Sequence, residues 1–543
     1  MSQTLLDIRQ LRTYLKSDGR TVKAVDDVSF SIPKGETFCL VGESGSGKSI
    51  TALSVMRLLP QDIASHPGGE ILFNGQNILT LPETALQQIR GSQIAMIFQE
   101  PMTSLNPVLS VGEQITEALQ LHHPAMSDAD AVERAMLALE QVQIPKARER
   151  FRDFPHQLSG GQRQRVMIAM ALACEPELLI ADEPTTALDV TVQAEILRLL
   201  RQLQDDTGMS TLFITHDFGV VAQMAQQVGV MQQGRLVEVG STAQVLRQPQ
   251  HAYTRQLLAA VPENLARRRE FSVSSPQIPS PPLLAIRHLS VWFPIKKGLL
   301  RRTVDHVRAV DDVSLDIPQG QIVALVGESG CGKTTLGRAI LQLEQPTSGS
   351  IQLHGQTLTG LSARELRPFR PKMQIAFQDP QSSLNPRLLI ETTLTEPLKA
   401  HGIGANHEER IERAAQILEN MQLPRDTLWR YPHEFSGGQR QRIGLARALV
   451  LNPEFIVCDE ITSALDVSVQ AEILQLLLKI RDEHKLTLLF ITHNIGVVEY
   501  LSDQTVVMYK GKIVERGTTA EVCGNPQEAY TQKLLQAVPR LRL

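Results

Sequence analysis

Short apolar runs alternate along the chain with longer segments of helical period. The runs are TFCLVG (37–42), LLIADE (178–183) and TLFITHD (211–217), and each has the length of a buried strand. Helical patterns cover 50–59 and 112–150, and VGVMQQGRLVEVG (228–240) is typical of a β-hairpin. Residues 5–30 also favour strands, with a turn at Gly19. Because strands alternate with helices, we predict an α/β fold with a mainly parallel sheet.

The same pattern then occurs a second time. FPHQLSGGQRQRVMIAMALACEPELLIADEPTTALD ends at Asp189, and YPHEFSGGQRQRIGLARALVLNPEFIVCDEITSALD ends at Asp466. The offset is constant at 277 residues (466 − 189 = 277). A period of this length indicates the tandem duplication of a whole domain, since solenoid repeats are far shorter.

A stretch between the two repeats has the composition of a linker. Residues 267–282, RRREFSVSSPQIPSPP, are basic at first and then rich in Ser and Pro, with few apolar residues. We therefore predict a first domain over 1–264, an extended linker over 265–282 and a second domain over 283–543. The length of 543 residues agrees, because it exceeds what one hydrophobic core usually holds.

Charge and composition narrow the classes of partner. The chain has 54 basic and 58 acidic residues, a formal net charge of −4, so no electrostatic surplus favours nucleic acid. The N-terminus lacks a signal-peptide pattern and no run of 18 apolar residues occurs, so another chain would have to provide any membrane crossing. Five cysteines, at 39, 174, 331, 458 and 523, show no zinc or disulfide spacing and fit a reducing cytosol.

A glycine-rich sequence follows an apolar run in each half and leads into a helical pattern. GESGSGKS and GESGCGKT both match G-x-x-x-x-G-K-[ST]. Such glycines let backbone N–H groups point into one concave site, and the helix N-terminus adds a favourable potential for phosphate. A purely structural turn is the alternative, but two matches in the same context disfavour it. The predicted ATP-binding residues here are Gly42, Glu43, Ser44, Gly45, Ser46, Gly47, Lys48 and Ser49, and Gly327, Glu328, Ser329, Gly330, Cys331, Gly332, Lys333 and Thr334.

These loops and the acids downstream predict binding of two ligands, phosphate and Mg²⁺. We expect the lysines to reach the outer phosphates, and the hydroxyls of Ser49 and Thr334 to bind Mg²⁺. LLIADE and FIVCDE end in adjacent acids, and a carboxylate at this end of a strand can hold Mg²⁺ through water. That assigns Asp182 and Asp459 to the metal.

The next acids along the chain are predicted to be catalytic. Glu183 and Glu460 are placed to polarise the attacking water as general bases. Two adjacent acids on a loop usually lie exposed to solvent and have no catalytic role. Their place after a buried strand, with a phosphate loop upstream, favours the catalytic interpretation.

The set and order of these motifs resemble those of the ATP-binding cassette (ABC) ATPases. Each half contains G-x-x-x-x-G-K-[ST], a Gln after a strand, SGGQ, a strand ending in Asp-Glu, ALD and a later His. The resemblance covers nearly the whole chain apart from the linker. It implies two tandem nucleotide-binding domains, each with a RecA-like core, an antiparallel β subdomain and a helical subdomain.

The resemblance also implies roles for residues outside the glycine-rich loops. Gln99 and Gln378 would contact Mg²⁺ and the attacking water, and His216 and His493 would bind the γ-phosphate as part of the catalytic site. A lone His after an apolar strand is more often structural, so only its place in the family order supports this role. The signature loops would contact ATP held by the opposite half; they are Ser159, Gly160, Gly161 and Gln162, and Ser436, Gly437, Gly438 and Gln439.

The physical chemistry of the signature loops agrees with that role. Ser-Gly-Gly before a helix offers an anion-binding N-terminus without side chains that block a close approach, although such a turn can also serve only to begin the helix. An aromatic residue is expected to stack on adenine near the start of each half. Tyr14 is the candidate in the first half, and Trp292 or Phe293 in the second.

Further segments resemble the peptide/nickel importer ATPases within this family. They are FQEPMTSLNP and FQDPQSSLNP after the Gln strands, and HAYTRQLLAAVP and EAYTQKLLQAVP near the end of each half. This resemblance, with both ATPases fused in one chain as in bacterial peptide and microcin C-type uptake systems, implies an ATP-hydrolysing subunit on the cytoplasmic face of the cell membrane. Its implied partners are two transmembrane permeases and, through them, an extracytoplasmic solute-binding protein, with no nucleic acid. Both halves keep every motif, which predicts two active sites, and the cysteine cluster that binds iron–sulfur in some relatives is missing.

Two other classes of fused or paired ATPase remain to be compared. Fused double-cassette translation factors act on ribosomes, but they usually carry a long, charged helical linker, whereas this one is short and rich in Pro. DNA repair and chromosome ATPases would need a long coiled coil or zinc modules, and neither pattern is visible.

Overall fold

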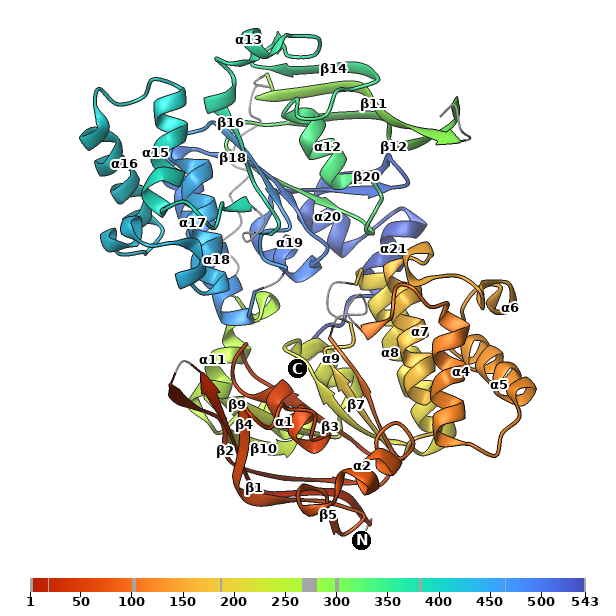
Figure 1. Cartoon of the computed structure of the whole chain (residues 1–543). Coiled ribbons are helices and arrows are strands. Elements are labelled where there is room, and N and C mark those ends of the chain that lie inside the picture. The colour runs from red at the N-terminus through yellow and green to blue at the C-terminus, as the bar shows by residue number, and fades with distance from the viewer. Residues whose placement is uncertain are drawn as a thin grey trace.

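A computed structural model describes residues 3–17, 19–99, 104–185, 188–265, 281–297, 302–379, 383–463 and 465–541. We call residues 3–265 the first half and 281–541 the second half. In Figure 1 the first half forms the lower part of the molecule and the second half the upper part. Each half contains one six-stranded and one four-stranded sheet. Most of the predicted linker, 266–280, lies outside the described residues.

The six-stranded sheet is the core of each half. Its order is β10-β9-β3-β8-β7-β6 in the first half and β16-β17-β18-β13-β19-β20 in the second. All neighbouring strands are parallel except β9–β10 and β19–β20, so the predictions of a mainly parallel sheet and of a hairpin over 228–240 are confirmed. The strands are β3 (Thr37–Val41), β6 (Ile94–Ile97), β7 (Leu178–Asp182), β8 (Ser210–Ile214), β9 (Gln227–Gln232) and β10 (Arg235–Ser241), and then β13 (Ile322–Val326), β16 (Met373–Ala376), β17 (Phe455–Asp459), β18 (Thr487–Ile491), β19 (Gln504–Tyr509) and β20 (Lys512–Thr518).

Burial explains why the central strands are apolar along their whole length. Every residue of β3, β7 and β8 is buried, because helices cover one face of this sheet and the four-stranded sheet covers the other together with α1. The functional loops begin where these strands end, at one edge of the sheet.

The four-stranded sheets are antiparallel and lie beside the core sheets. Gly19, with φ 75°, makes the predicted turn between the first two strands. In β2 buried and exposed residues alternate, as expected when one face of a sheet packs on a core. The strands are β1 (Thr4–Ser17), β2 (Arg20–Pro33), β4 (Ala64–Phe73) and β5 (Gln76–Asn77), and β11 (Leu284–Lys297), β12 (Arg302–Ile317), β14 (Ser348–Leu353) and β15 (Gln356–Thr357).

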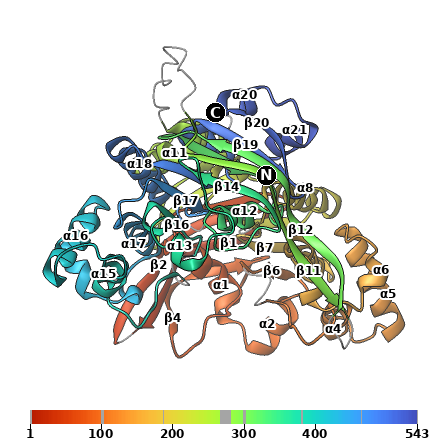
Figure 2. The ribbon, with the colours of Figure 1, turned by 90° about the horizontal axis from the view of Figure 1, so that it is seen from above.

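The helices of the first half include the predicted helical insert as α4, α5 and α6. Figure 2 shows these helices and their counterparts in the second half on opposite flanks of the molecule. The helices are α1 (Lys48–Val55), α2 (Glu83–Ile89), α4 (Val111–His122), α5 (Asp128–Gln141), α6 (Ala147–Arg150), α7 (Gly160–Leu172), α8 (Val190–Thr207), α9 (Phe218–Met224), α10 (Thr242–Arg247) and α11 (Ala252–Ala260), with 3-10 turns η1 (Ile78–Thr80), η2 (Pro155–Gln157) and η3 (Pro262–Asn264).

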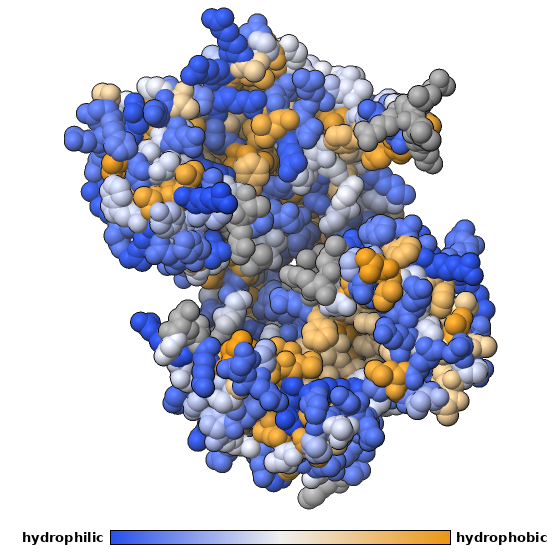
Figure 3. All heavy atoms as spheres, viewed as in Figure 1, coloured by the Kyte–Doolittle hydropathy of each residue, from blue (hydrophilic) through white to orange (hydrophobic). Residues whose placement is uncertain are grey.

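The second half repeats this arrangement. Its helices are α12 (Lys333–Ile340), α13 (Ala363–Leu366), α15 (Ile390–Ala400), α16 (His407–Asn420), α17 (Gly437–Leu449), α18 (Val467–His484), α19 (Ile495–Leu501), α20 (Thr519–Gly524) and α21 (Ala529–Gln536), with η4 (Arg370–Lys372), η5 (Arg425–Trp429) and η6 (Pro432–Glu434). Each helix of the described ranges is too short or too polar to cross a membrane. The face seen in Figure 3 mixes apolar with hydrophilic residues.

One predicted helix ends earlier than expected. The helix predicted over 50–59 begins at Lys48 and ends at Val55. Arg57 has a left-handed backbone with φ 46°, and Pro60 disfavours a helical conformation for the residue before it. The predicted end was therefore wrong by one turn.

The tail of each half packs on the other half. Helix α11 contacts α18, η3 contacts α19, and α21 contacts α8. Leu541 is buried in the hydrophobic core of the first half, and Figure 1 shows the C-terminal end beside α9. A Cβ atom added to Gly219 would lie 2.1 Å from the backbone oxygen of Pro539. This exchange of tails, in which the tail of each half contacts the other half, therefore joins the two halves.

Glu263 makes this contact sensitive to pH. Its Oε1 atom lies 3.3 Å from where a Cβ of Gly496 would stand. Burial, followed by the charges of Asp217 and Glu499, raises the pKa of Glu263 to about 7, although Arg540 opposes the shift. The carboxyl group is therefore neutral at low pH and negative, among other acids, at high pH.

We expect Glu263→Gln to flatten the pH dependence of unfolding. In the wild type the contribution of Glu263 is fully present below its ordinary pKa of 4.5 and is lost as the pH rises through about 7. Solvent reaches one side of the side chain, which limits the effect to about 1 kcal/mol. Chemical unfolding at pH 5 and pH 8 measures it, with Glu36→Gln as a control. An unchanged pH dependence in Glu263→Gln would contradict this assignment.

Candidate functional site

The glycine-rich loop of each half wraps around a buried lysine. Lys48 is only 6% exposed, and its Nζ atom donates to the backbone oxygens of Gly42 and Glu43, both at 2.8 Å. Lys333 makes the same bonds in the second half, at 2.8 and 2.9 Å. Burial lowers the pKa of Lys48, and nearby acids oppose that shift. Each lysine is thus held on the floor of its loop, within the concave site that the sequence predicts.

Glycine is required at the last turn of each loop. Gly47 has φ 104°, and a Cβ there would lie 2.3 Å from the backbone oxygen of Ala24. Gly332 has φ 106° and would clash in the same way, at 1.9 Å from the oxygen of Ala309. Both are the N-caps of the helices that follow, α1 and α12, so the close approach places helix N–H groups at the loop.

The predicted metal ligands meet at the end of the acidic strand. Ser49 Oγ donates to Asp182 Oδ1 at 3.0 Å, and Thr334 Oγ1 donates to Asp459 Oδ1 at 3.1 Å. Burial raises the pKa of both aspartates against the lowering effect of these hydroxyls. A buried carboxylate beside a hydroxyl is a hard oxygen donor set, and this pair fits Mg²⁺.

Few protein ligands gather at this point. Within the described part of the chain, no group of three or more His, Cys, Asp or Glu side chains could hold a metal ion. Mg²⁺ usually keeps water and takes substrate phosphates beside one or two protein ligands. The site therefore fits a metal that arrives with a nucleotide.

The predicted catalytic glutamate is held by the predicted Gln and His in each half. Gln99 Nε2 donates to Glu183 Oε2 at 3.0 Å, and His216 Nδ1 lies 3.3 Å from Glu183 Oε1. In the second half Gln378 Nε2 donates to Glu460 Oε2 at 2.8 Å. The His493 Nδ1 atom lies 3.6 Å from Glu460 Oε1.

The charges around these groups shift their titration. Burial lowers the pKa of His216, but the hydrogen bond and charge of Glu183, together with Asp217, outweigh burial and raise it. Burial raises the pKa of Glu460, but His493 and Lys333 outweigh burial and lower it. Glu460 is therefore favoured as a carboxylate, the form in which a general base accepts a proton.

Both catalytic candidates have a strained backbone. Glu183 and Glu460 each have φ 47°, which is uncommon for a residue with a side chain. Such strain is concentrated at functional sites, where the surrounding structure enforces it. The apolar runs and the motif spacing of the sequence do not predict this backbone strain.

The predicted signature loops begin α7 and α17. Ser159 accepts a bond from the Gln162 backbone N–H at 3.3 Å, and Gln162 Oε1 accepts one from the Ser159 N–H at 3.1 Å. The second loop has the same capping box. A Cβ added to Gly160 would meet open space, so a ligand can approach the helix N-terminus there.

Two aspartates, Asp189 and Asp466, make contacts between the halves that the sequence did not lead us to predict. Asp466 Oδ1 accepts a bond from the Ser44 backbone N–H at 2.6 Å, and Asp189 does the same for the Ser329 N–H. Thr191 Oγ1 also donates to Glu328 Oε1 at 2.8 Å. The aspartates close the repeated ALD sequence, so the constant 277-residue offset was the signal that could have found them.

No hydrogen bond within the described ranges joins a signature loop directly to the opposite glycine-rich loop. Each glycine-rich loop instead meets the aspartate of the other half. It also meets a tyrosine of its own tail. Tyr253 OH donates to Glu43 Oε2 at 3.0 Å, and Tyr530 OH accepts from the Glu328 N–H at 3.1 Å.

The strand register identifies the counterpart of Tyr14. Tyr14 pairs with Lys23 between β1 and β2, and Trp292 pairs with Arg308 between β11 and β12. Each cation covers its ring, with Lys23 at 5.5 Å and Arg308 at 4.8 Å from the centroid. Trp292 is therefore the structural equivalent of Tyr14, and Phe293 is not. The stacking of either ring on adenine stays a prediction.

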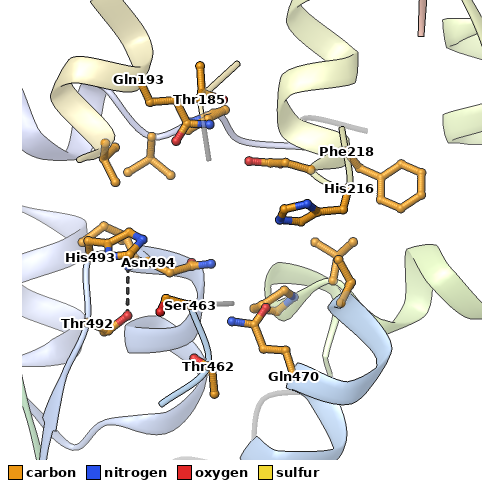
Figure 4. A pocket seen from close by; sticks show the side chains of 18 of the residues that line it. Thr185, Gln193, His216, Phe218, Thr462, Ser463, Gln470, Thr492, His493 and Asn494 are labelled. Atoms are coloured by element: carbon orange, nitrogen blue, oxygen red, sulfur yellow. Dashed lines mark hydrogen bonds between the residues drawn. The ribbon is translucent and has the colours of Figure 1, made fainter. Parts of the chain in front are cut away.

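A cavity of about 150 Å³ lies between the two halves. His216 and Phe218 face it from the first half, and His493 and Asn494 face it from the second (Figure 4). Glu263 and Pro539 from the exchanged tails complete the wall. One predicted catalytic histidine from each half therefore lines this cavity, whereas Glu183 and Glu460 do not.

Comparison with known proteins gives two family matches. The family described as ABC transporter matches residues 25–186 and 310–463. The family described as oligopeptide/dipeptide transporter, C-terminal region, matches residues 237–283 and 514–543. The second match recurs at the end of each half and includes most of the exchanged tails.

Individual proteins match over nearly the whole chain. The peptidoglycan transport ATP-binding protein YejF of Agrobacterium fabrum is 51% identical over 536 residues, 99% of this chain and 96% of that protein. The glutathione import ATP-binding protein GsiA of Salmonella typhimurium is 48% identical over 562 residues, 99% of this chain and 90% of that protein. A solved dimeric ATP-binding cassette bound to ADP and Pi aligns with 44% of this chain at 28% identity, with a TM-score of 0.40 and 99% of its own length covered.

Proposed function

The chain belongs to the ABC transporter family of ATP-hydrolysing proteins, and we propose that it powers an importer for peptides or peptide-like compounds. The main support for peptides as the transported class of compound is the match to the oligopeptide/dipeptide transporter C-terminal region at the end of both halves. The names of YejF and GsiA support it, because peptidoglycan fragments and glutathione both contain short peptide chains.

Each half supplies the groups for one hydrolytic centre. Lys48 and Lys333 bind the outer phosphates, and Glu183 and Glu460 take a proton from the attacking water. Both glutamates are oriented by the amide of a Gln and the imidazole of a His. Mg²⁺, where bound, supplies positive charge at the β- and γ-phosphates, and the oxygens of Ser49, Gln99 and Asp182, or of Thr334, Gln378 and Asp459, would hold it.

The two halves complete each other's ATP sites. ATP on Lys48 also contacts the signature loop at Ser436, and ATP on Lys333 contacts Ser159. The support is the pairing of Asp466 with the Ser44 N–H, because it brings the second half to the first glycine-rich loop. ATP binds the closed arrangement with higher affinity than the open one. Loss of the γ-phosphate removes this difference in affinity, so the halves separate. The exchanged tails keep the halves together in the open state.

We propose that membrane permeases receive this motion. The described ranges contain no helix that could span a membrane. The proposed partners are two transmembrane permeases, on whose cytoplasmic face the chain sits, and the support is the match to the two transporter families. They in turn receive solute from an extracytoplasmic binding protein. Helices α4–α6 and α15–α16 pass closure to the permeases in this proposal.

Co-purification tests this function. The tagged full chain, solubilised from membranes in detergent, should bring down two permease subunits, and a strain lacking it should lose uptake of short peptides. The Glu183→Gln, Glu460→Gln variant should bring down the same permeases without restoring uptake. Recovery of ribosomes in place of permeases would contradict the proposal and favour a translation factor.

Cys331 gives a separate test of the second site. It occupies the position of Ser46 in the first loop, and its Sγ atom lies 4.0 Å from Lys333 Nζ. Burial raises the pKa of the Cys331 thiol, so alkylation by N-ethylmaleimide should be slow and faster at high pH. We expect it to block ATP binding in the second site, and ATP should protect the thiol.

Cys331→Ser is the matched control, because it copies the first loop. It should bind ATP normally and resist the reagent. Full ATPase activity after stoichiometric alkylation of Cys331 in the wild type would show that this loop does not bind ATP.

A further inference from the structure

The C-terminal tail of each half reaches back to the glycine-rich loop of the same half. Tyr253 on α11 donates from its hydroxyl to Glu43 Oε2 at 3.0 Å, and Tyr530 OH on α21 accepts from the Glu328 N–H at 3.1 Å. The two tyrosines are equivalent, because both lie in the AYT sequence of their tails, and each glutamate is the second residue of its loop. The same contact between tail and loop therefore occurs in both halves.

Tyr253 is well suited to hold the loop. It is only 7% exposed, so packing fixes the ring and few water molecules compete for the hydroxyl. Burial, followed by the charge of Glu43, raises the pKa of Tyr253, and the phenol therefore keeps the proton that it donates. A hydrogen bond to a charged acceptor is stronger than one between neutral groups. The bond thus restrains Glu43 at the start of the glycine-rich loop.

The residue after each glutamate is held by the opposite half. Asp466, the N-cap of α18, accepts from the Ser44 N–H at 2.6 Å. Asp189, the N-cap of α8, accepts from the Ser329 N–H. Two adjacent residues of each loop therefore have different partners, since the first is bonded to the tail of its own half and the second to a helix of the other half.

The tail helix and the opposite helix also pack against each other. Helix α11 contacts α18, and α21 contacts α8. In Figure 1, α11 lies beside α18. The loop, the tail helix and the opposite helix thus form a closed ring of three contacts in each half. Because a displacement of one member disturbs its contacts with the other two, the position of the loop is coupled to the pairing of the halves.

We propose that Tyr253 and Tyr530 are positioning residues through which the C-terminal tails set the affinity of the two glycine-rich loops for ATP. The inference rests on the proposed binding of ATP at Lys48 and Lys333. Each tyrosine acts through the glutamate of its loop and does not touch the phosphates or the attacking water. Because a coupling between two sites is reciprocal, ATP on the loop also strengthens the packing of the tail on the opposite half.

The affinity of a single site for ATP tests the proposal in the full chain. In a Lys333→Ala background only the first site is expected to bind ATP, so equilibrium dialysis measures that site alone. Tyr253→Phe keeps the ring and removes the hydroxyl, and it should weaken binding about three- to tenfold, which corresponds to the loss of one net hydrogen bond. Gln256→Ala, at an exposed position of the same helix, should bind ATP within about twofold of the background.

A double-mutant cycle separates positioning from a general loss of structure. Glu43→Ala removes the acceptor and should also weaken binding, and Tyr253→Phe should then have no further effect. In an otherwise wild-type chain, Tyr253→Phe should raise KM for ATP without lowering kcat, because the hydrolytic groups stay in place. Tyr530→Phe in a Lys48→Ala background should weaken ATP binding at the second site by a similar factor.

The outcomes separate this inference from the proposed function. Unchanged affinity in either tyrosine variant, or an equal loss in Gln256→Ala, would overturn the inference. Additive losses in Tyr253→Phe with Glu43→Ala, or a lower kcat with an unchanged KM in Tyr253→Phe, would overturn it as well. All of these results leave the proposed function intact. A Lys333→Ala chain that binds no ATP would instead contradict the ATP site at Lys48, and the inference would fall with that site.

Discussion

The double variant Glu183→Gln, Glu460→Gln will bind ATP in both sites but hydrolyse it about 10²–10⁴-fold more slowly than the wild type, which is the usual contribution of a general base. Glutamine keeps the size of the side chain and can still contact Gln99 or Gln378. It has no carboxylate to accept the proton of the attacking water. ATP binding by equilibrium dialysis and phosphate release under the same conditions measure the two properties separately.

The chain offers a matched control for this variant. Glu177 and Glu454 are also related by the 277-residue offset, and they lie just before β7 and β17 with lysines at 3.6 and 3.3 Å. Glu177→Gln, Glu454→Gln should leave hydrolysis within about twofold, since surface ion pairs contribute little. Near-normal turnover in Glu183→Gln, Glu460→Gln would show that neither glutamate acts as a general base.

Lys48→Ala should lose one of the two bound ATP molecules and slow steady-state hydrolysis about 10²–10³-fold, the cost of removing one preorganised group that stabilises developing charge. The buried lysine is fixed by the oxygens of Gly42 and Glu43, so no other cation of the loop can replace it. Lys333→Ala should have the corresponding effect on the other site. The stoichiometry of bound ATP, measured beside turnover, shows whether one site is lost.

Lys34→Ala is the control for the lysine variants. Lys34 is exposed and pairs with Glu177, far from the phosphates that Lys48 is predicted to bind. It should bind two ATP molecules. Two bound ATP molecules in Lys48→Ala would show that Lys48 does not hold the outer phosphates.

Features that are encoded locally could be predicted from the sequence. The buried strands appear as apolar runs, and the phosphate loops appear as glycines at fixed spacing before a helix, so their positions follow from short stretches of chain. The tandem cassettes are confirmed by the family match to both halves. The structure also brings Ser49 to Asp182 and Gln99 to Glu183, as their shared site requires.

Features that depend on distant parts of the chain could not be predicted. Ser44 and Asp466 are 422 residues apart, and no local pattern states that they meet. The exchange of tails and the shared cavity depend in the same way on how one half is placed against the other. The choice between Trp292 and Phe293 needed the strand register, because bulges in β11 shift the pairing.

The pairing of the two halves within one chain is tested most directly by a cysteine cross-link. In a Cys331→Ser background, Ser44→Cys with Asp466→Cys should form a disulfide on mild oxidation, because the Ser44 N–H bonds to the Asp466 side chain at 2.6 Å. The product should have the mass of one chain, and ATP should increase its yield. Ser44→Cys with Asp189→Cys, which places both thiols in the first half, should not cross-link. A disulfide in that control pair in place of the 44–466 pair, or 44–466 products with the mass of two chains, would contradict the head-to-tail pairing.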